Sequence, residues 1–381
     1  MRSGETWDVV VIGGGPAGAT AAARLAQAGL SVAVLERHVH PQPKVCGEFL
    51  SPECAVALDL LGAGEAFRRL PAVPIQTVGL YGGGRAVEAP LDPPAWGLSR
   101  FVFDDWLLRW AALCGAQVFE GYEATAVSRV GDGFCVRARQ VQDLTAVEFQ
   151  ARFVAGAFGV KSGAVVPLAG LDPPGRRKSG FIAFSVHLRC PAVDRRVELY
   201  FFEHGYVGLG SVEAGRVNLG GLVEPAFFRH LGGKFMTLLE YLAGRNRAFR
   251  ERLDGASDWT PFRATVHPGF GFGRRAWNGV ALIGDRAGCV HPFSGDGIGM
   301  ALQSALLWAE CVTEAWTDWL HPEAVLERYD RRWRQAFAAR LRTTWWLDWL
   351  RRRPGGLSIT LGLIGRYPSL LAWIYRRTRG L

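Results

Sequence analysis

Residues 7–36, WDVVVIGGGPAGATAAARLAQAGLSVAVLE, predict a strand, a tight turn, a helix and a second strand in direct succession. The apolar, β-branched run 7–12 indicates the first strand, and the small residues 19–29 indicate a helix that ends near Gly29. The run 31–36 indicates the second strand. A parallel βαβ unit of this kind predicts an α/β fold that begins with a Rossmann-like domain.

The turn inside this unit has the GxGxxG spacing, at Gly13, Gly15 and Gly18. Gly13 permits a tight turn, Gly15 lets the backbone approach a pyrophosphate, and Gly18 lets the helix pack closely on the strand. The helix N-terminus adds unpaired N–H groups and the positive end of its dipole. We therefore predict a dinucleotide site in which Pro16 and Ala17 also contact the ligand.

An acid closes the second strand where a carboxylate would accept both hydroxyls of an adenosine ribose: Glu36, followed by Arg37. With the strand, turn, helix and acid all in place, the motif is far more specific than a lone glycine-rich turn. Its position at the start of the chain favours FAD, although this segment alone also fits NAD.

A second concentration of turn residues lies at 284–299, GDRAGCVHPFSGDGIG. It follows a strand-like run, 277–283, so Asp285 would emerge at the carboxyl end of that strand, where ligands bind in open α/β sheets. A long helix then starts, and its N-terminus would stabilise the negative charge that develops near N1 and O2 of a reduced flavin. The alternative for Asp285 is a plain turn or capping role.

We therefore expect the first turn to hold the pyrophosphate of FAD and the second to hold its ribityl chain and ring. The second turn supplies six predicted cofactor contacts: Gly284, Asp285, Pro292, Gly295, Gly297 and Ile298.

These two turns, with a third motif at 98–118, resemble the FAD-dependent oxidoreductases of the aromatic hydroxylase superfamily. The third motif, LSRFVFDDWLLRWAALCGAQV, is similar to a family segment that starts a helix and places an arginine against FAD, a role that passes to Arg100. The resemblance implies a Rossmann-like FAD-binding domain, an inserted antiparallel β-sheet domain for the substrate and, here, a C-terminal helical region.

Within that superfamily the sequence looks closest to the geranylgeranyl reductases. The segment 44–48, KVCGE, is similar to theirs, in which a cysteine faces the flavin, and the hairpin 205–221 is similar to one that lines their substrate tunnel. The resemblance places Lys44, Cys46 and Gly47 at the cofactor, and Tyr206, Val207 and Glu48 at the substrate. Val207 replaces the family tryptophan, and the Phe-Pro that normally follows is absent, so the prenyl nature of the substrate stays open.

The source of electrons also stays open. The stretch 156–162, GAFGVKS, has Phe158 where the hydroxylases have an aspartate linked to FAD and NAD(P)H binding. The reductant is therefore either NAD(P)H or an external donor such as an electron-donor protein. The Trp-x-Trp-x-Ile-Pro motif of the superfamily's halogenases does not occur in the chain.

The cofactor motifs are discontinuous, so the domains must be discontinuous as well. We assign residues 1–72, 97–172 and 264–318 to the FAD-binding domain, and residues 73–96 and 173–263, where strand patterns alternate, to the substrate domain. Residues 319–381 form the C-terminal helical, basic and aromatic region.

Two residues are candidates for proton donation. Cys46 would lie over the flavin, its alternative being a small buried hydrophobic residue. His291 precedes Pro292 in the second turn, its alternative being a hydrogen-bonding loop residue. The predicted reaction is hydride transfer from flavin N5 to a C=C bond of an isoprenoid- or lipid-like substrate. The alternatives are a monooxygenase that acts through a flavin hydroperoxide and a flavin-binding redox sensor without turnover.

The charge distribution predicts the partners. The formal net charge is +9, and residues 331–381 alone carry twelve arginines against one acid, Asp348, so the rest of the chain is nearly neutral. The longest charge-free run there, 354–365, is short of the roughly 20 residues that a transmembrane helix needs. We expect either amphipathic helices on an anionic membrane surface or helices that pack on the body and roof the substrate tunnel.

The cysteine pattern predicts the compartment. Seven scattered cysteines without a CxxC motif argue against a disulfide framework and against a metal site. No charged leader with a cleavage site is seen. We expect a cytoplasmic protein, in addition peripheral on the inner face of the membrane if the tail binds lipid, with no nucleic-acid partner.

Overall fold

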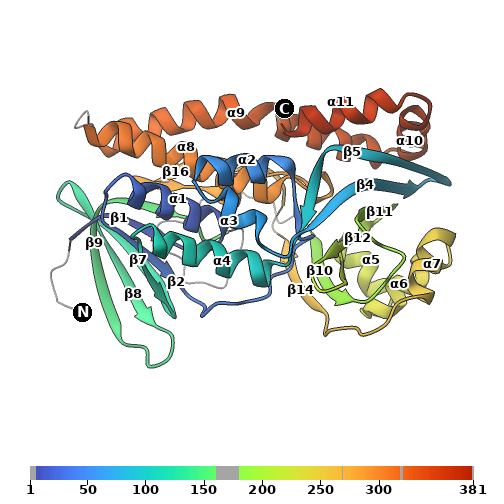
Figure 1. The fold of residues 1–381 in the computed structure, drawn as a ribbon, viewed down its shortest axis with the longest axis horizontal. Coiled ribbons are helices and arrows are strands. Elements are labelled where there is room, and N and C mark those ends of the chain that lie inside the picture. Colours follow the sequence, from blue (N-terminus) through green and yellow to red (C-terminus); the bar gives the residue numbers. More distant parts are fainter. Residues whose placement is uncertain (1–5, 160–179, 268, 318–320, 380–381) are drawn as a thin grey trace.

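The computed structural model describes residues 6–159, 180–267, 269–317 and 321–379. Within these residues, two eight-stranded sheets lie side by side, and the C-terminal helices run along one long edge of the molecule, at the top in Figure 1. The predicted α/β fold class, a Rossmann-like part followed by a β-sheet part and C-terminal helices, is confirmed.

The first sheet has the order β16-β17-β9-β1-β2-β6, with the β7–β8 hairpin joined through β9. Its centre is parallel, because β1 pairs with β2 and β9 in parallel, β9 with β17, and β2 with β6. The strands are β1 (Thr6–Ile12), β2 (Val32–Glu36), β6 (Gln117–Glu120), β7 (Tyr122–Val130), β8 (Gly133–Gln140), β9 (Ala146–Gly156), β16 (Ala276–Trp277) and β17 (Val280–Leu282).

The two faces of this sheet are covered differently, as the alternation of β1 requires. Val9 and Val11 point into a core shared with three helices, α1 (Pro16–Gln27), α4 (Arg100–Leu113) and α8 (Gly297–Thr317). Val10 and Ile12 point to the opposite face, where the β7–β8 hairpin packs. Figure 1 shows these helices on one side of the sheet and the hairpin strands on the other. Because the central strands are parallel, their carboxyl ends all lie at the same end of this sheet.

The second sheet has the order β14-β10-β13-β12-β11-β4-β5-β3. One of its faces carries a second core, which it shares with the short helices α5 (Pro225–His230), α6 (Phe235–Ala243) and α7 (Arg247–Asp254). The other face is left for the site described below. The strands are β3 (Phe49–Leu50), β4 (Val73–Gly82), β5 (Arg85–Gly97), β10 (Phe181–Leu188), β11 (Arg196–Phe202), β12 (Gly205–Val212), β13 (Arg216–Val223) and β14 (Arg263–His267).

The remaining elements connect the two sheets. Helices α2 (Pro52–Leu60) and α3 (Gly64–Arg68) pack on the first core, and the small sheet β15 (Gly271–Phe272) and β18 (Gly288–Cys289) precedes α8. Two short 3₁₀ turns, η1 (Gly284–Arg286) and η2 (Pro292–Ser294), form the second glycine-rich turn.

Three helices complete the chain: α9 (Pro322–Arg351), α10 (Gly356–Arg366) and α11 (Pro368–Arg379). The first half of α9 is core, because Tyr329, Trp333 and Phe337 are almost completely buried against the first sheet's helices. Helices α10 and α11 lie over β4 and β5 (Figure 1). Among the described residues no single helix has the length and hydropathy of a membrane span; α10 and α11 meet that criterion only when taken together across a bend of 110°.

Candidate cofactor and substrate site

One cavity of about 1280 Å³ extends from the first glycine-rich turn to the free face of the second sheet. Its size exceeds the roughly 300–1,000 Å³ of a pocket for one small ligand. The lining comes from β1, the loop 42–48, α4, the second sheet and the C-terminal helices. The cavity therefore has room for a long cofactor at one end and a substrate at the other.

The first turn is shaped to receive a pyrophosphate. A Cβ added to Gly18 would lie 1.8 Å from the carbonyl oxygen of Gly13, so only glycine lets α1 pack this closely on β1. Gly13 has φ +106°, and its Cβ would meet the Ala157 carbonyl at 2.7 Å. At Gly15 an added Cβ would meet nothing within 4 Å. The space above Gly15 at the helix N-terminus is thus open to a ligand.

Glu36 lies at the carboxyl end of β2 beside this turn. Its two carboxylate oxygens accept hydrogen bonds from the backbone N–H groups of Gly14, at 2.7 Å, and His38, at 2.9 Å. These bonds fix the carboxylate in the cavity wall and leave lone pairs for further donors. Together with Arg37, Pro16 and Ala17, which also line the cavity, the arrangement fits the adenosine half of FAD.

The two glycine-rich turns lie against each other. Gly284 has φ +62°, its N–H donates to the Ser304 hydroxyl at 2.9 Å, and its Cβ would lie 2.9 Å from Cβ of Ala17. Asp285 lines the cavity, as do four further residues of this segment: Pro292, Gly295, Gly297 and Ile298. Because both turns border the same cavity, one long ligand could contact both of them, as FAD would.

A cluster of charges from α4 and the loop 42–48 lies between the two ends. Arg100 makes a bidentate pair with the fully buried Asp104, at 2.5 and 2.7 Å, and Lys44 approaches the same carboxylate at 3.5 Å. Burial alone would lower the pKa of Arg100, but Asp104 more than offsets it, and the pKa is raised. Arg100 therefore stays charged at the cavity wall, where it would face the cofactor.

Cys46 and Glu48 form the other side of this cluster. The backbone N–H of Arg100 donates to one carboxylate oxygen of Glu48 at 3.0 Å, and the second oxygen lies 2.5 Å from Nε2 of His187 on β10. The hydrogen bond to Glu48 raises the pKa of His187. Burial raises the pKa of the Cys46 thiol, with Arg100 opposing it. The cavity wall thus carries a protonated thiol beside a carboxylate–imidazole pair.

Sequence reasoning did not find two residues of this cluster. His187 lies on the cavity side of β10, and Asn218 of β13 donates from Nδ2 to the Cys46 carbonyl at 2.7 Å. The strand alternation in 179–190 places His187 on the same face as Ala183, which lines the cavity. The pairing of His187 with Glu48 could not be predicted from the sequence, because the two residues are 139 positions apart in the chain.

Apart from Gly18, whose predicted task was close packing, two predicted residues lie outside the cavity wall, and these two predictions are corrected. Val207 is fully buried in the core under α6 and α7, because it alternates with Tyr206 and Gly208, which face the cavity. His291 is also buried and lies outside the cavity lining, 3.3 Å from Asp348 of α9. Burial lowers the pKa of His291 to about 3, with Asp348 opposing the shift, which disfavours His291 as the acid.

Most of the other predicted site residues do line the cavity. Among them are Gly13, Gly15, Gly47 and Tyr206, while Gly18 lies behind the turn as a packing residue. Phe158 also lines the cavity, and the guanidinium carbon of Arg286 lies 4.8 Å from the centroid of its ring. The positions 160–162 of the same motif fall outside the described residues.

The substrate end of the cavity is apolar. Aliphatic side chains from the second sheet face others from α10 and α11, which close the cavity as a lid: Val78, Leu80, Leu91, Val197 and Leu199 on one side, and Leu357, Leu361, Ile364, Leu371 and Ile374 on the other. Gly208 and Gly210 of β12 leave space between the two rows. This end can therefore hold a long hydrophobic group and exclude water from it.

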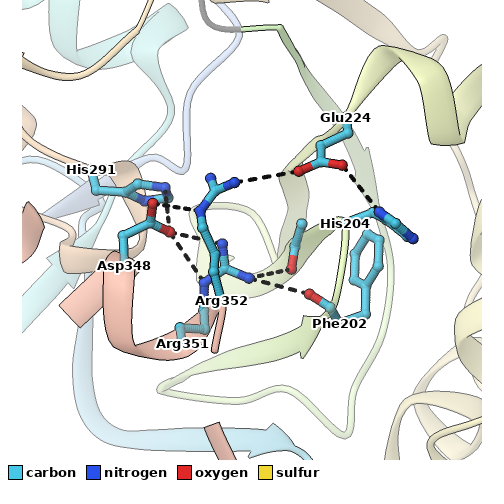
Figure 2. Close-up of polar contacts among 8 residues, drawn as sticks. Phe202, His204, Glu224, His291, Asp348, Arg351 and Arg352 are labelled. Carbon is cyan, nitrogen blue, oxygen red and sulfur yellow. Dashed lines mark hydrogen bonds and ion pairs between the residues drawn. The ribbon is translucent and has the colours of Figure 1, made fainter. Parts of the chain in front are cut away.

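A chain of polar contacts joins the end of α9 to the body (Figure 2). Asp348 accepts from Arg351 and Arg352, each at 2.8 Å, and faces His291. Arg351 also donates to the Phe202 carbonyl at 3.2 Å, and Arg352 reaches Glu224, at 3.3 Å. These contacts hold the start of the lid against the second sheet and the second glycine-rich turn.

Comparison with known proteins identifies the family of the chain and several relatives. Residues 6–223 match the family described as FAD binding domain. The chain is 29% identical to digeranylgeranylglycerophospholipid reductase 2 of Methanopyrus kandleri over 87% of this chain and 83% of that protein. It is 28% identical to the menaquinone reductase of Mycobacterium tuberculosis, over 87% and 82%. The myxobacterial chondrochloren halogenase shares the fold, with a TM-score of 0.79, 23% identity and coverage of 97% and 91%.

Proposed function

Since the chain belongs to the FAD binding domain family and is an FAD-dependent oxidoreductase, we propose that it reduces carbon–carbon double bonds of a hydrophobic, isoprenoid-like substrate. The observation that carries the proposal is the single cavity, which joins the dinucleotide turn to an apolar chamber closed by the lid. The names of the reductase relatives support the same substrate class.

The protein's own residues would prepare the reaction as follows. Gly13, Gly15 and the N-terminus of α1 would hold the pyrophosphate, and Glu36 the ribose. When bound and reduced, the FAD cofactor would supply the hydride. The aliphatic rows of the second sheet and the lid would align the substrate and exclude water, which removes competing proton sources.

The proton would come from the cluster at the loop 42–48. The Cys46 thiol lines the cavity and stays protonated because burial raises its pKa. Glu48 also lines the cavity, and His187 lies 2.5 Å behind it. We propose that Cys46 donates the proton to the substrate carbon and that the Glu48–His187 pair restores it.

The electron source is part of the proposal. NAD(P)H or an external reductant, such as an electron-donor protein, would reduce the flavin. Phe158 and Arg286 in the cavity wall are the residues whose substitution would change a direct reaction with NAD(P)H. Anaerobic mixing with NADPH, with dithionite as the reference, distinguishes the two sources.

The proposal is tested by anaerobic turnover. Dithionite-reduced protein, mixed with an unsaturated isoprenoid lipid, should give a product heavier by two hydrogen atoms per bond reduced. Turnover that requires oxygen and adds an oxygen atom would replace the proposal with the monooxygenase alternative. Flavin reduction without product, both with and without oxygen, would favour the redox sensor.

A further inference from the structure

Within the part of the chain that the structure describes, the exposed tryptophans lie at the end of α9 and on α11. Among the described residues, the tryptophans that are at least a third exposed are Trp345, Trp346, Trp349 and Trp373. Trp345 is 63% exposed and Trp373 59% exposed. Large aromatic side chains are normally buried or in contact with a partner. Their gathering in one stretch of helices marks a surface that contacts something apolar.

Helix α10 is apolar on two opposite sides. Leu357, Leu361 and Ile364 point into the cavity. Ile359 and Leu363, half a turn away, are 62% and 48% exposed and do not line the cavity. The lid is therefore one helix thick, with apolar side chains on its inner and outer surfaces.

The outer surface is also strongly basic. Arg342, Arg353, Arg366 and Arg377 are exposed, and no ion pair joins any of the four to an acid within the described residues. The single acid of residues 331–381, Asp348, is paired with Arg351 and Arg352 and lies beside His291 (Figure 2). Arg353 lies over the ring of Trp349, 4.4 Å from its centroid. Aromatic and cationic groups thus alternate without compensating negative charge.

We propose that this surface docks on an anionic lipid bilayer. We call it the outer lid face and define it by Trp345, Trp346, Trp349, Ile359, Leu363 and Trp373 together with the four arginines. The indole rings would lie at the level of the headgroups, and the arginines would contact the lipid phosphates. The lid would then separate the acyl chains from the cavity by the thickness of one helix. A lipid-dissolved substrate could enter past α11, where Arg376 is both exposed and part of the cavity lining.

The charge of this surface favours lipid over a second copy of the chain. Two outer lid faces brought together would place eight unpaired arginines opposite one another, which like-charge repulsion disfavours. An anionic bilayer instead offers negative charge and an apolar interior at the same surface.

Vesicle sedimentation of the full-length flavoprotein tests the proposal. Wild-type protein should sediment with vesicles of phosphatidylglycerol and phosphatidylcholine, bind pure phosphatidylcholine weakly, and be released by salt, because charges at the surface are screened within about 8 Å at physiological ionic strength. The variant Arg342→Gln/Arg353→Gln/Arg366→Gln/Arg377→Gln should lose about fivefold in partition coefficient per arginine. The variant Trp345→Ser/Trp346→Ser/Trp373→Ser should also lose binding at least about tenfold.

Control variants replace exposed arginines and exposed large apolar residues on other surfaces. Arg24→Gln/Arg229→Gln and Leu60→Ser/Leu113→Ser replace exposed residues away from the lid and should bind as the wild type does. All variants should keep the flavin absorbance. The proposal is overturned if the wild type ignores anionic vesicles at low salt, or if the controls lose as much binding as the lid variants. It is also overturned if the tryptophan variant abolishes self-association, or binding of a nucleic acid, instead of vesicle binding.

The experiment needs no turnover, so its result is separate from the reaction proposed above. A protein that binds vesicles but reduces no isoprenoid would keep the docking surface and lose the proposed substrate. A protein that reduces isoprenoids in detergent but ignores vesicles would do the reverse.

Discussion

At the scale of single residues, two glycines of one turn have different tasks. A Cβ added at Gly15 would meet nothing within 4 Å, whereas a Cβ added at Gly18 would collide with the carbonyl oxygen of Gly13. The sequence spacing predicted both tasks, because the geometry of a strand–turn–helix unit is local and is set by which positions lack a Cβ. The Glu48–His187 pair was not predictable, because it joins the loop 42–48 to strand β10 by a contact between residues 139 positions apart in the chain.

Substituting the two glycines should separate cofactor binding from folding. We expect Gly15→Val to fold with a melting temperature near that of the wild type and to lose FAD, because its side chain fills the open space. Gly18→Val should be destabilised by about 1–3 kcal/mol or more, because α1 must move away from β1. Thermal unfolding and the flavin spectrum after denaturation measure both effects. Equal destabilisation of the two variants would contradict this difference.

Removing the carboxylate of Glu48 should change the pH dependence of turnover. The hydrogen bond to Glu48 raises the pKa of His187, so the pair is intact at low pH and is lost as the pH rises through that raised pKa. In Glu48→Gln the alkaline limb of the kcat profile should move to lower pH. In Cys46→Ser the limb should stay in place while kcat falls about tenfold or more, within the range of lost acid catalysis. An unchanged profile in Glu48→Gln would exclude the pair from proton supply.

At the scale of elements, the packing of α8 and α9 explains why the basic tail is not a separate tail. Asp296, at the start of α8, is fully buried and lies 3.5 Å from Arg340 of α9. Tyr329, Trp333 and Phe337 repeat at four-residue spacing and fill the first core. The arginines of residues 331–381 predicted an exposed basic region. The burial of these three aromatic side chains was not predicted, because it depends on contacts with other elements that the sequence does not reveal. Truncation at Arg331 would therefore remove core residues and is not a test of membrane binding.

Asp296 predicts a pH-dependent stability. Burial raises its pKa well above the ordinary value, so the folded state binds the proton more tightly than the unfolded state, and stability is lost as the pH rises through the raised pKa. Asp296→Asn should therefore gain in melting temperature over the wild type as the pH increases from about 5 to 9.

Asp330 of α9 is the matched control, because its pKa is shifted in the opposite direction from that of Asp296. Burial would raise its pKa, but hydrogen bonds from Arg275 and Arg334 lower it overall. Asp330→Asn should destabilise the protein at neutral pH, and the difference should disappear as the pH falls through the lowered pKa. If both variants responded to pH in the same direction, the assignment for Asp296 would be wrong.

At the scale of the whole molecule, the cavity exists only where both sheets and the C-terminal helices meet. The sequence predicted each part from local patterns, and the domain boundaries stay predictions. It did not decide between a membrane-bound tail and a lid. The structure shows that α10 and α11 line the cavity, and we propose that the same helices also dock on a membrane through the outer lid face.

Filling the cavity from β12 should affect the substrate alone. A Cβ at Gly210 would meet only Val197, at 3.9 Å, so a larger side chain would extend into the apolar chamber. We expect Gly210→Leu to keep FAD and its melting temperature but to raise KM for long isoprenoids at least about tenfold, a loss comparable to removing one or two buried methylene contacts. A parallel loss of FAD would show that the chamber belongs to the cofactor site.

The order of strands in the first sheet has a consequence for synthesis on the ribosome. Strand β9 ends at Gly156, but its parallel neighbour β17 begins only at Val280, which at about 5–20 residues per second is made roughly 6–25 seconds later. Until then the end of β9 at Ala155 and Gly156 lacks its β17 partner, and the second glycine-rich turn has not been made. The lid helices α10 and α11 follow later still. Flavin capture is therefore expected only after the second glycine-rich turn has been made, and the apolar chamber stays open to chaperones until α10 and α11 are in place.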